Sequence, residues 1–87
     1  MTSRKVIATG KDTDGDILSL CNRPELWSPR IKASAINDIE NGTYRYFVRD
    51  SLGVEADVKV GYRTSGKYLY TVPDNSSENN LDNLPNC

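Results

Sequence analysis

The three alternating aspartates within residues 12–16 form the pattern that most resembles a metal site. Alternating carboxylates with a nearby glycine are typical of the calcium-binding loop of an EF-hand. In such a loop beginning at Asp12, the required glycine position is occupied by Ile17 and the closing glutamate position by Arg23. We therefore interpret residues 12–16 as a charged turn, and we expect neither a metal nor another cofactor in this chain.

A second chemical pattern runs from Gly61 to Lys67, where the residues match the phosphate-binding loop G-x-x-x-x-G-K. That loop continues with Ser or Thr, which binds magnesium, and with a helix whose N-terminus faces the phosphates. Here Tyr68 follows, and the sequence continues as another strand. We expect Gly66 and Lys67 to belong to a turn and not to a nucleotide site.

Catalytic groups are scarce in this sequence. The chain has no histidine, which excludes Ser–His, Cys–His and histidine–metal sites. The cysteines Cys21 and Cys87 are too few for a zinc site without histidine. Paired carboxylates or a desolvated lysine remain open as catalytic groups, but the spacing singles out none of them. We expect that the protein is not an enzyme.

Arginines that alternate with aromatic residues along the predicted strands form the candidate binding surface. Such a surface holds single-stranded nucleic acid by stacking bases on the rings and attracting phosphates to the cations. Alternatively, the aromatic residues are ordinary strand formers and the arginines pair with Glu55 and Asp57. The candidate residues are Arg45, Phe47, Arg49, Arg63, Tyr68 and Tyr70.

The charge is unevenly distributed between the body of the chain and its end. Residues 1–72 hold all eleven basic residues and nine acidic ones, whereas residues 73–87 hold three acidic residues and no basic one. The body is therefore slightly basic and the end acidic, which favours contact between them. Neither part has the strong positive excess of a dedicated nucleic-acid-binding protein.

Cys21 and Cys87 are expected to be free thiols. Residues 1–12 lack the apolar core of a secretory signal, and no apolar run is long enough to span a bilayer. These observations favour a cytoplasmic protein, and thiols stay reduced in the cytoplasm. A disulfide that links Cys21 to Cys87 is the alternative.

Two strands, residues 4–11 and 16–21, are predicted to position the first turn. The dipeptide Asp14-Gly15 between them is typical of a two-residue hairpin turn. Closing that turn places Thr9 opposite Leu20. It also pairs Lys11 with Leu18 and Ile7 with Asn22, and it puts Ile7, Leu18 and Leu20 on one face.

An irregular segment, residues 22–33, follows this hairpin and contains the single tryptophan, Trp27. We interpret Trp27 as a core residue that anchors the segment, in preference to an exposed platform for a ligand. A short helix is then predicted over residues 35–41, with Ser34 as its N-cap and Gly42 as its stop.

Three further strands are predicted over residues 43–50, 54–60 and 67–72. The first two form a hairpin with a three-residue loop that ends in glycine, and Val48 lies opposite Ala56. The element order ββαβββ predicts an α+β fold, with a mainly antiparallel sheet packed on one short helix. The same register also pairs Tyr46 with Val58, Tyr44 with Val60, Arg49 with Glu55 and Phe47 with Asp57.

The polar end of the chain, residues 73–87, carries two leucines. If Leu69 faces the helix, Tyr68 and Tyr70 lie on the opposite face of the sheet, where water would reach them. We expect this tail to dock on the sheet and to cover both tyrosines, whereas a free tail would offer its leucines to a partner. The docking residues are Asn79, Asn80, Leu81, Asp82, Asn83, Leu84 and Pro85.

These motifs resemble a small bacterial family that is known only as a domain of unknown function, number thirty-eight ninety-two in its series. The resemblance covers nearly the whole chain, and its last stretch is the most specific part. It implies one complete unit over residues 1–87, with a body at 4–72, and it implies no chemistry. The matching residues are Ala35, Ile36, Ile39 and Gly42, then Tyr46 with Val48, then Lys67, Tyr68 and Leu69, and finally Asn79 through Pro85.

Taken together, the patterns predict a non-enzymatic binding module that acts through its strand-rich face and its tail. We expect a protein partner, no membrane and a monomeric chain. Binding of single-stranded nucleic acid through the arginine and aromatic face is the alternative. A small-ligand pocket beside Trp27 is a third possibility, which a ligand-induced change in tryptophan fluorescence would test.

Overall fold

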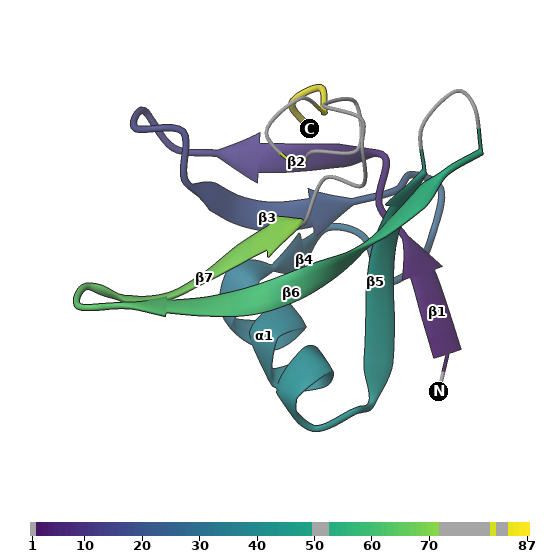
Figure 1. The fold of residues 1–87 in the computed structure, drawn as a ribbon. Coiled ribbons are helices and arrows are strands. Elements are labelled where there is room, and N and C mark those ends of the chain that lie inside the picture. Colours follow the sequence, from purple (N-terminus) through teal and green to yellow (C-terminus); the bar gives the residue numbers. More distant parts are fainter. Residues whose placement is uncertain (1, 50–52, 72–80, 82–83) are drawn as a thin grey trace.

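The computed structural model describes residues 2–49, 53–71, 81 and 84–87, which form two β-sheets and one helix (Figure 1). The larger sheet has the strand order β1-β5-β6-β7, and the smaller sheet has the order β2-β3-β4. The predicted α+β class is confirmed, with the strands divided between two sheets. The elements are β1 Thr2–Lys5, β2 Ala8–Lys11, β3 Ile17–Cys21, β4 Arg30–Ile31, α1 Lys32–Glu40, β5 Tyr44–Arg49, β6 Glu55–Arg63 and β7 Gly66–Thr71.

The predicted first strand, residues 4–11, is divided between the two sheets at Val6 and Ile7. The N–H of Val6 donates to the carbonyl of Phe47 on β5 at 2.7 Å. The N–H of Ile7 donates to the carbonyl of Cys21 on β3 at 3.0 Å. Consecutive residues therefore bond to different sheets, and β1 lies parallel to β5. The sequence did not reveal this division because the same residues also fit one continuous strand.

The hairpin of β2 and β3 has the predicted pairing at its centre, where Thr9 lies opposite Leu20. Its turn is one residue longer than the predicted two-residue turn, because the N–H of Asp12 donates to the carbonyl of Asp16 at 3.0 Å. Gly15 occupies the left-handed position of this turn, with φ 86°. The Asp12 carboxylate accepts two backbone N–H groups of the turn at 2.9 Å each. The aspartates thus stabilise a turn.

The longer turn changes which side chains of this hairpin are buried. The register shifts just before Lys11, so that Lys11 pairs with Ile17 and not with Leu18. Ile17 is buried, whereas Leu18 is 47% exposed. The predicted common face of Ile7, Leu18 and Leu20 is therefore wrong, because only Leu20 is buried.

The helix α1 begins at Lys32, so the predicted N-cap at Ser34 is wrong and Ile31 precedes the helix. Its end is as predicted, since Gly42 has φ 68° and donates its N–H to the carbonyl of Ile39 at 3.2 Å. A glycine at this position is a strong stop signal. Ile31 has no capping side chain, and the start of the helix therefore has no equivalent signal in the sequence.

The hairpin of β5 and β6 has the predicted register, with Val48 opposite Ala56. The pairing with β5 ends at Asp57, and β6 then pairs with β7 up to the turn at which Arg63 lies opposite Gly66. The side of β5 away from β6 pairs with β1. Two predicted pairs lie beyond Asp57 and are absent from the described β5–β6 pairing: Tyr46 with Val58 and Tyr44 with Val60.

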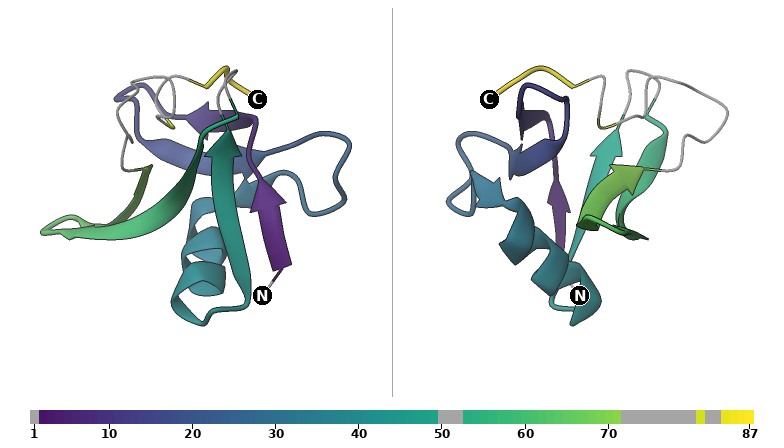
Figure 2. Two further views of the ribbon diagram at one scale, coloured as in Figure 1. Left: turned by 45° about the vertical axis from the view of Figure 1, so that its right-hand side comes forward. Right: turned by 90° about the vertical axis from the view of Figure 1, so that its left-hand side faces the viewer.

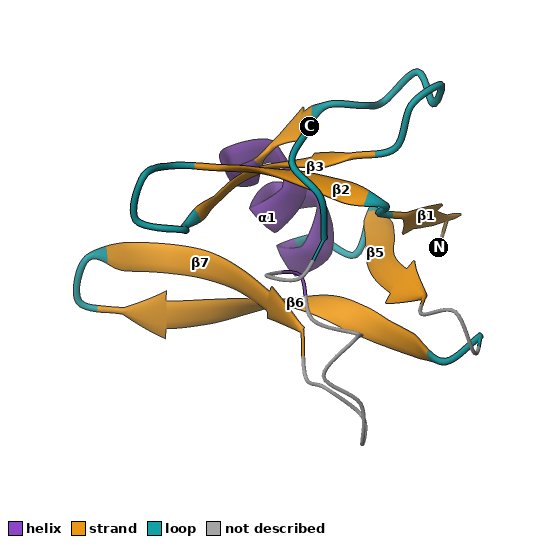
Figure 3. Cartoon of the chain, turned by 90° about the horizontal axis from the view of Figure 1, so that it is seen from above, coloured by secondary structure: helices purple, strands orange, loops and turns teal. Residues whose placement is uncertain are grey.

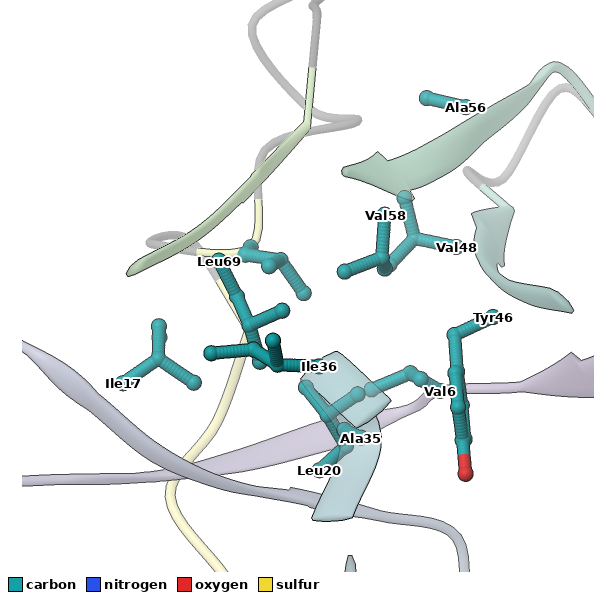
Figure 4. Packing of buried hydrophobic residues seen from close by; sticks show 11 residues of the cluster. Val6, Ile17, Leu20, Ala35, Ile36, Tyr46, Val48, Ala56, Val58 and Leu69 are labelled. Carbon is teal, nitrogen blue, oxygen red and sulfur yellow. The ribbon is translucent and has the colours of Figure 1, made fainter. Parts of the chain in front are cut away.

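The core lies between the two sheets and α1, which contacts strands of both sheets (Figure 2). Tyr46 and Leu20 have no exposed surface. Side chains from β3, α1, β5, β6 and β7 point toward one another in this core (Figure 4). The Trp27 ring packs edge-on against Tyr46, with 5.7 Å between the ring centroids. This contact agrees with the predicted role of Trp27 as a core residue.

Leu81 docks into the core and not onto the tyrosines of β7. It is 1% exposed and belongs to the same buried cluster as Leu69, and its N–H donates to Oγ1 of Thr71 at 3.1 Å. Because successive strand residues point to opposite faces, Leu69 and Thr71 point to the core while Tyr68 and Tyr70 point away. The expected docking on the protein's own sheet is confirmed for Leu81, but the expected cover of the tyrosines by Leu81 is wrong.

The last residues, 84–87, lie beside β2 (Figure 3). The N–H of Thr9 donates to the carbonyl of Pro85 at 3.0 Å, and the N–H of Cys87 donates to the carbonyl of Thr9 at 3.0 Å. This segment therefore adds to the free edge of β2 like a short parallel strand. Of the predicted docking residues, Asn79, Asn80, Asp82 and Asn83 lie outside the described part of the chain.

Cys21 and Cys87 form a disulfide, with 6.4 Å between their Cα atoms. The prediction of two free thiols is therefore wrong. The last residues bring Cys87 to β2, and β2 pairs on its other side with β3, which carries Cys21. The two cysteines come close only because the tail docks, and the sequence alone does not predict this for residues that are 66 positions apart.

Candidate functional site

A cleft of about 540 Å³ lies between β7 and the turn that joins β2 to β3. The two hairpins that form its walls are seen from above in Figure 3. One wall comes from the aspartate-rich turn and the other from the β6–β7 hairpin, with Lys32 of α1 also at the site. The main lining residues are Asp14, Asp16, Lys32, Arg63, Tyr68 and Tyr70.

The edge of β7 that faces away from β6 opens onto this cleft. Arg63 and Gly66 flank a two-residue turn and lie opposite each other. In an antiparallel pair only alternate residues hydrogen-bond to the partner strand, so the main-chain groups of Gly66, Tyr68 and Tyr70 bond to β6. The main-chain groups of Lys67 and Leu69 therefore point away from β6. In the described part of the chain, no strand pairs with this side of β7. Both residues line the cleft, which gives it a row of main-chain donors and acceptors.

Tyr68 is positioned by a glycine on the neighbouring strand. Gly61 lies opposite Tyr68, and a Cβ atom at Gly61 would lie only 2.3 Å from Cζ of the tyrosine ring. The ring therefore lies directly over the Gly61 backbone. The guanidinium of Arg63 lies 4.1 Å from the centre of the same ring, and the Tyr70 ring lies 5.7 Å away. These contacts form an aromatic wall beside the free edge of β7.

Substitution of Gly61 by alanine is expected to displace the Tyr68 ring and to lower the free energy of unfolding by roughly 1–3 kcal/mol, because the new methyl group overpacks the site. Urea unfolding measures this loss. In a Tyr68→Ala background, the same Gly61→Ala change should cost much less, since the ring that it contacts is gone. Equal losses in both backgrounds would contradict the packing of Tyr68 on Gly61.

Arg45 and Arg49 lie on β5 and do not line the cleft. Arg45 donates to Asp57 at 2.7 Å and forms an ion pair with Glu55 at 3.4 Å. Arg49 also pairs with Glu55, and the bond from Arg49 is the main reason why the pKa of this carboxyl lies below its usual value. The guanidinium of Arg45 covers the ring of Phe47 at 4.8 Å. The six candidate residues therefore separate into two groups. Arg63, Tyr68 and Tyr70 lie at the cleft, whereas the other three lie on β5, where both arginines are paired with carboxylates.

The β6–β7 hairpin is tied to the end of α1 through Glu40. The Glu40 carboxylate accepts hydrogen bonds from Lys67 Nζ at 2.8 Å and from the Tyr62 hydroxyl at 2.7 Å. These bonds, the one from Lys67 first, hold the pKa of Glu40 below its usual value. The bond to Glu40 also raises the pKa of Tyr62. The Lys67 side chain therefore points to the helix, while its main-chain groups remain at the cleft.

A buried charged cluster, which the sequence did not reveal, lies around Asp38 of α1. Arg30 of β4 donates two hydrogen bonds to the Asp38 carboxylate, both at 3.0 Å. The Tyr46 hydroxyl donates to the same carboxylate at 2.6 Å and accepts from Arg4 of β1 at 2.9 Å. The Arg4 guanidinium also lies 3.4 Å from the centre of the Tyr44 ring. We call Arg4, Arg30, Asp38 and Tyr46 the Asp38 cluster; it joins β1, β4, α1 and β5.

The protonation of the Asp38 cluster follows from these bonds. Burial by itself raises the pKa of Asp38, but the hydrogen bonds from Arg30 and Tyr46 outweigh it, so that the pKa lies below its usual value. Burial, together with the bond to Asp38, raises the pKa of Tyr46. Asp38 is therefore ionised and Tyr46 neutral at neutral pH. Each member of the cluster is hydrogen-bonded to another member, which is typical of a structural network.

Residues 84–87, the C-terminal strap, contact β2 through main-chain and side-chain hydrogen bonds. Thr9 makes two main-chain hydrogen bonds with the strap, Lys11 Nζ donates to the carbonyl of Leu84 at 3.0 Å, and Leu84 packs against the core. A protein hydrogen bond contributes about 1 kcal/mol net. Ordering one residue costs roughly 1–2 kcal/mol. These contacts therefore do not clearly exceed the cost of ordering the strap, and the disulfide of Cys87 provides the additional hold.

The described residues contain no group of three or more His, Cys, Asp or Glu side chains that could hold a metal ion. In the same part of the chain, no helix has the length and apolar character needed to cross a membrane.

Comparisons with known proteins identify a family and no characterised relative. The family model described as "Protein of unknown function (DUF3892)" matches residues 5–85. No curated protein matches the chain. No solved structure matches it either.

Proposed function

The chain belongs to the family of proteins of unknown function DUF3892, and we propose that it is a non-enzymatic module that binds an extended segment of a partner protein along β7. The observation that carries this proposal is the edge of β7, which opens onto a cleft and has no strand partner in the described part of the chain. An extended segment can add to such an edge through main-chain hydrogen bonds. The cleft volume of about 540 Å³ lies within the usual range of binding sites.

The surroundings of this edge support a polypeptide as the ligand. Lys67 and Leu69 supply main-chain donors and acceptors, while Tyr68 and Tyr70 supply ring surface for the side chains of the added segment. Acidic and basic side chains both line the cleft, so it lacks the excess of positive charge that holds a phosphate backbone. We therefore favour a protein partner for a monomeric, cytoplasmic chain.

Nucleic-acid binding has weaker support from the same contacts. Arg45 and Arg49 are paired with carboxylates, and Arg63 lies 3.9 Å from Asp16. Paired arginines contribute less to the attraction of phosphates than unpaired ones. We therefore expect no binding of a single-stranded oligonucleotide, even at low salt, where such binding is strongest.

Blocking the edge of β7 tests the proposed function. Linear peptides selected from a displayed library on the full-length protein provide the ligand. We expect Lys67→Pro to weaken their binding at least tenfold, because proline removes the N–H that faces the cleft. The matched variant Lys67→Ala keeps that N–H and removes the same ammonium group, so it should bind nearly as well as the unmodified protein.

The location of the bound peptide is measured by amide hydrogen exchange. Binding should protect the amides of Lys67 and Leu69, which point away from β6. Selected peptides that leave both amides unprotected, or that bind the proline and alanine variants equally, would exclude strand addition at β7. Oligonucleotide binding that falls steeply with salt would favour the nucleic-acid function instead.

A further inference from the structure

The two cysteines of the disulfide have different surroundings. Cys21 lies on β3 and is 3% exposed, whereas Cys87 lies in the strap and is exposed. A hollow of about 350 Å³, which Ile7, Ala8 and Arg23 also line, reaches both cysteines. Cys87 is therefore the more exposed of the two cysteine residues, and we take its sulfur as the point of attack for an external thiolate. Arg23 is the charged residue of this hollow and favours the approach of a thiolate anion.

Thr9, whose main chain holds the strap, also carries an unsatisfied polar side chain. Thr9 has no exposed surface, and its hydroxyl has no hydrogen-bond partner among the described residues. A buried unpaired hydroxyl is unfavourable, because in water it would be hydrogen-bonded. The bonds described above between Thr9 and the strap use main-chain groups, and departure of the strap would expose these groups at the edge of β2 to water.

We propose that Cys21–Cys87 is a site of thiol–disulfide exchange with a dithiol reductant, and that its reduction releases the strap from the edge of β2. This site lies on the smaller sheet, so the inference goes beyond strand addition at β7 and does not depend on it. An exposed disulfide that holds one short segment is of the kind that is broken and re-formed in use, whereas disulfides that resist reduction are structural.

The exchange proceeds in two balanced steps. One thiolate of the reductant attacks Sγ of Cys87, the bond to Cys21 breaks, and the Cys21 thiolate leaves with the bonding electrons and takes up a proton. The second thiol of the reductant then closes its own disulfide and releases Cys87 as a thiol. The reductant thus loses two electrons, and the protein gains two thiols.

The fold has separate anchors that remain after the strap leaves. Leu81 stays within the core, and its N–H bond to Thr71 lies outside the strap. The pairing of β2 with β3 uses the other edge of β2 and does not involve the strap. The groups that reduction uncovers are the N–H and carbonyl of Thr9, which form a free strand edge in the reduced protein.

Amide hydrogen exchange of the full-length protein, oxidised and reduced, tests the release. We expect the Thr9 amide to exchange at least about a hundredfold faster after reduction by dithiothreitol, while the amides of β5 and β6 remain protected. The variant Cys21→Ser/Cys87→Ser should resemble the reduced protein and should not respond to the reductant. Unchanged protection of the Thr9 amide on reduction would overturn the proposal. Loss of protection throughout the chain would also overturn it, because the disulfide would then stabilise the whole fold and not the strap alone.

The point of attack is tested separately with glutathione, a monothiol that has no second thiol of its own and therefore completes the second step only in a separate reaction with another glutathione molecule. Peptide mapping by mass spectrometry should find the mixed disulfide on Cys87 and a free thiol at Cys21. An adduct on Cys21 would contradict the proposed direction. If the bond remains intact at glutathione and dithiothreitol concentrations that reduce an exposed disulfide, the exchange site is rejected.

Discussion

Replacing Leu81 by alanine is expected to lower the free energy of unfolding by about 3 kcal/mol, within the range for fully buried leucines. Leu81 is 1% exposed and packs in the core cluster that includes Leu69. The truncation removes apolar contacts and leaves a cavity that neighbours on different elements cannot readily fill. Urea unfolding followed by the fluorescence of Trp27, which packs against the same core, measures the loss.

The matched control for this change is Leu84→Ala in the same tail. Leu84 packs against the core but is only partly buried, so its truncation should cost clearly less, about 1 kcal/mol. Both variants should be compared with the disulfide intact. Equal, small losses at the two positions would show that Leu81 is not a core residue and that the tail is free for a partner.

Replacing Asp38 by asparagine is expected to cost roughly 2 kcal/mol, because the buried carboxylate loses its charge-assisted hydrogen bonds with Arg30, whose own side chain is 35% exposed. The Tyr46 hydroxyl also loses its ionised acceptor. Asparagine has nearly the same size as aspartate, so the loss reports charge and hydrogen bonding and not a cavity. Thermal or urea unfolding at pH 7 provides the measurement.

The pH dependence of this effect has a defined sign. The pKa of Asp38 in the folded protein lies below its usual value, so the unfolded chain binds a proton more readily. The stabilisation is therefore complete above about pH 4, the usual pKa of aspartate, and is lost as the pH falls through the lower pKa of the folded state. The difference in stability between the wild type and Asp38→Asn should shrink below about pH 4.

An exposed ion pair provides the control for Asp38. Asp57 receives a hydrogen bond from Arg45 at 2.7 Å, but its side chain is 47% exposed. Asp57→Asn should therefore change the free energy of unfolding by at most about 1 kcal/mol. If Asp38→Asn has an equally small effect, the Asp38 cluster is not the buried network that the contacts describe.

The parts of the fold that the sequence predicted are those with local signals. Gly42 marked the end of α1, and glycines marked the hairpins of β2 with β3 and of β6 with β7, although Gly66 and Lys67 begin β7 and do not lie within the turn as predicted. The register of β5 and β6 followed from matching apolar residues, such as Val48 and Ala56, on one face. Each of these signals lies within about ten residues of the structure that it specifies.

The parts that the sequence did not predict depend on contacts between distant residues. No turn in the sequence indicates the parallel pairing of β1 with β5. Val6, where the chain passes from one sheet to the other, has the sequence character of an ordinary strand residue. The disulfide required knowledge of where the tail lies. The turn beyond Lys11 was misread by one residue, and that error was enough to interchange the roles of Ile17 and Leu18.

The candidate site was predictable only in part for the same reason. Alternation along β7 correctly placed Tyr68 and Tyr70 on the face away from Leu69. The cleft itself arises where the turn of one sheet approaches the edge of the other, and no local pattern encodes that approach. The Asp38 cluster was missed because its three charged members come from three different elements, and each looks like a solvated residue when read alone.

The bonds between Thr9 and the strap also bear on the order of folding. They join residues more than seventy positions apart, and Leu81 likewise joins a core whose other members lie well before it in the sequence. Bringing distant residues together costs more loop-closure entropy than the local pairing of β2 with β3. We therefore expect the hairpin of β2 and β3 to form before the tail docks and completes the core.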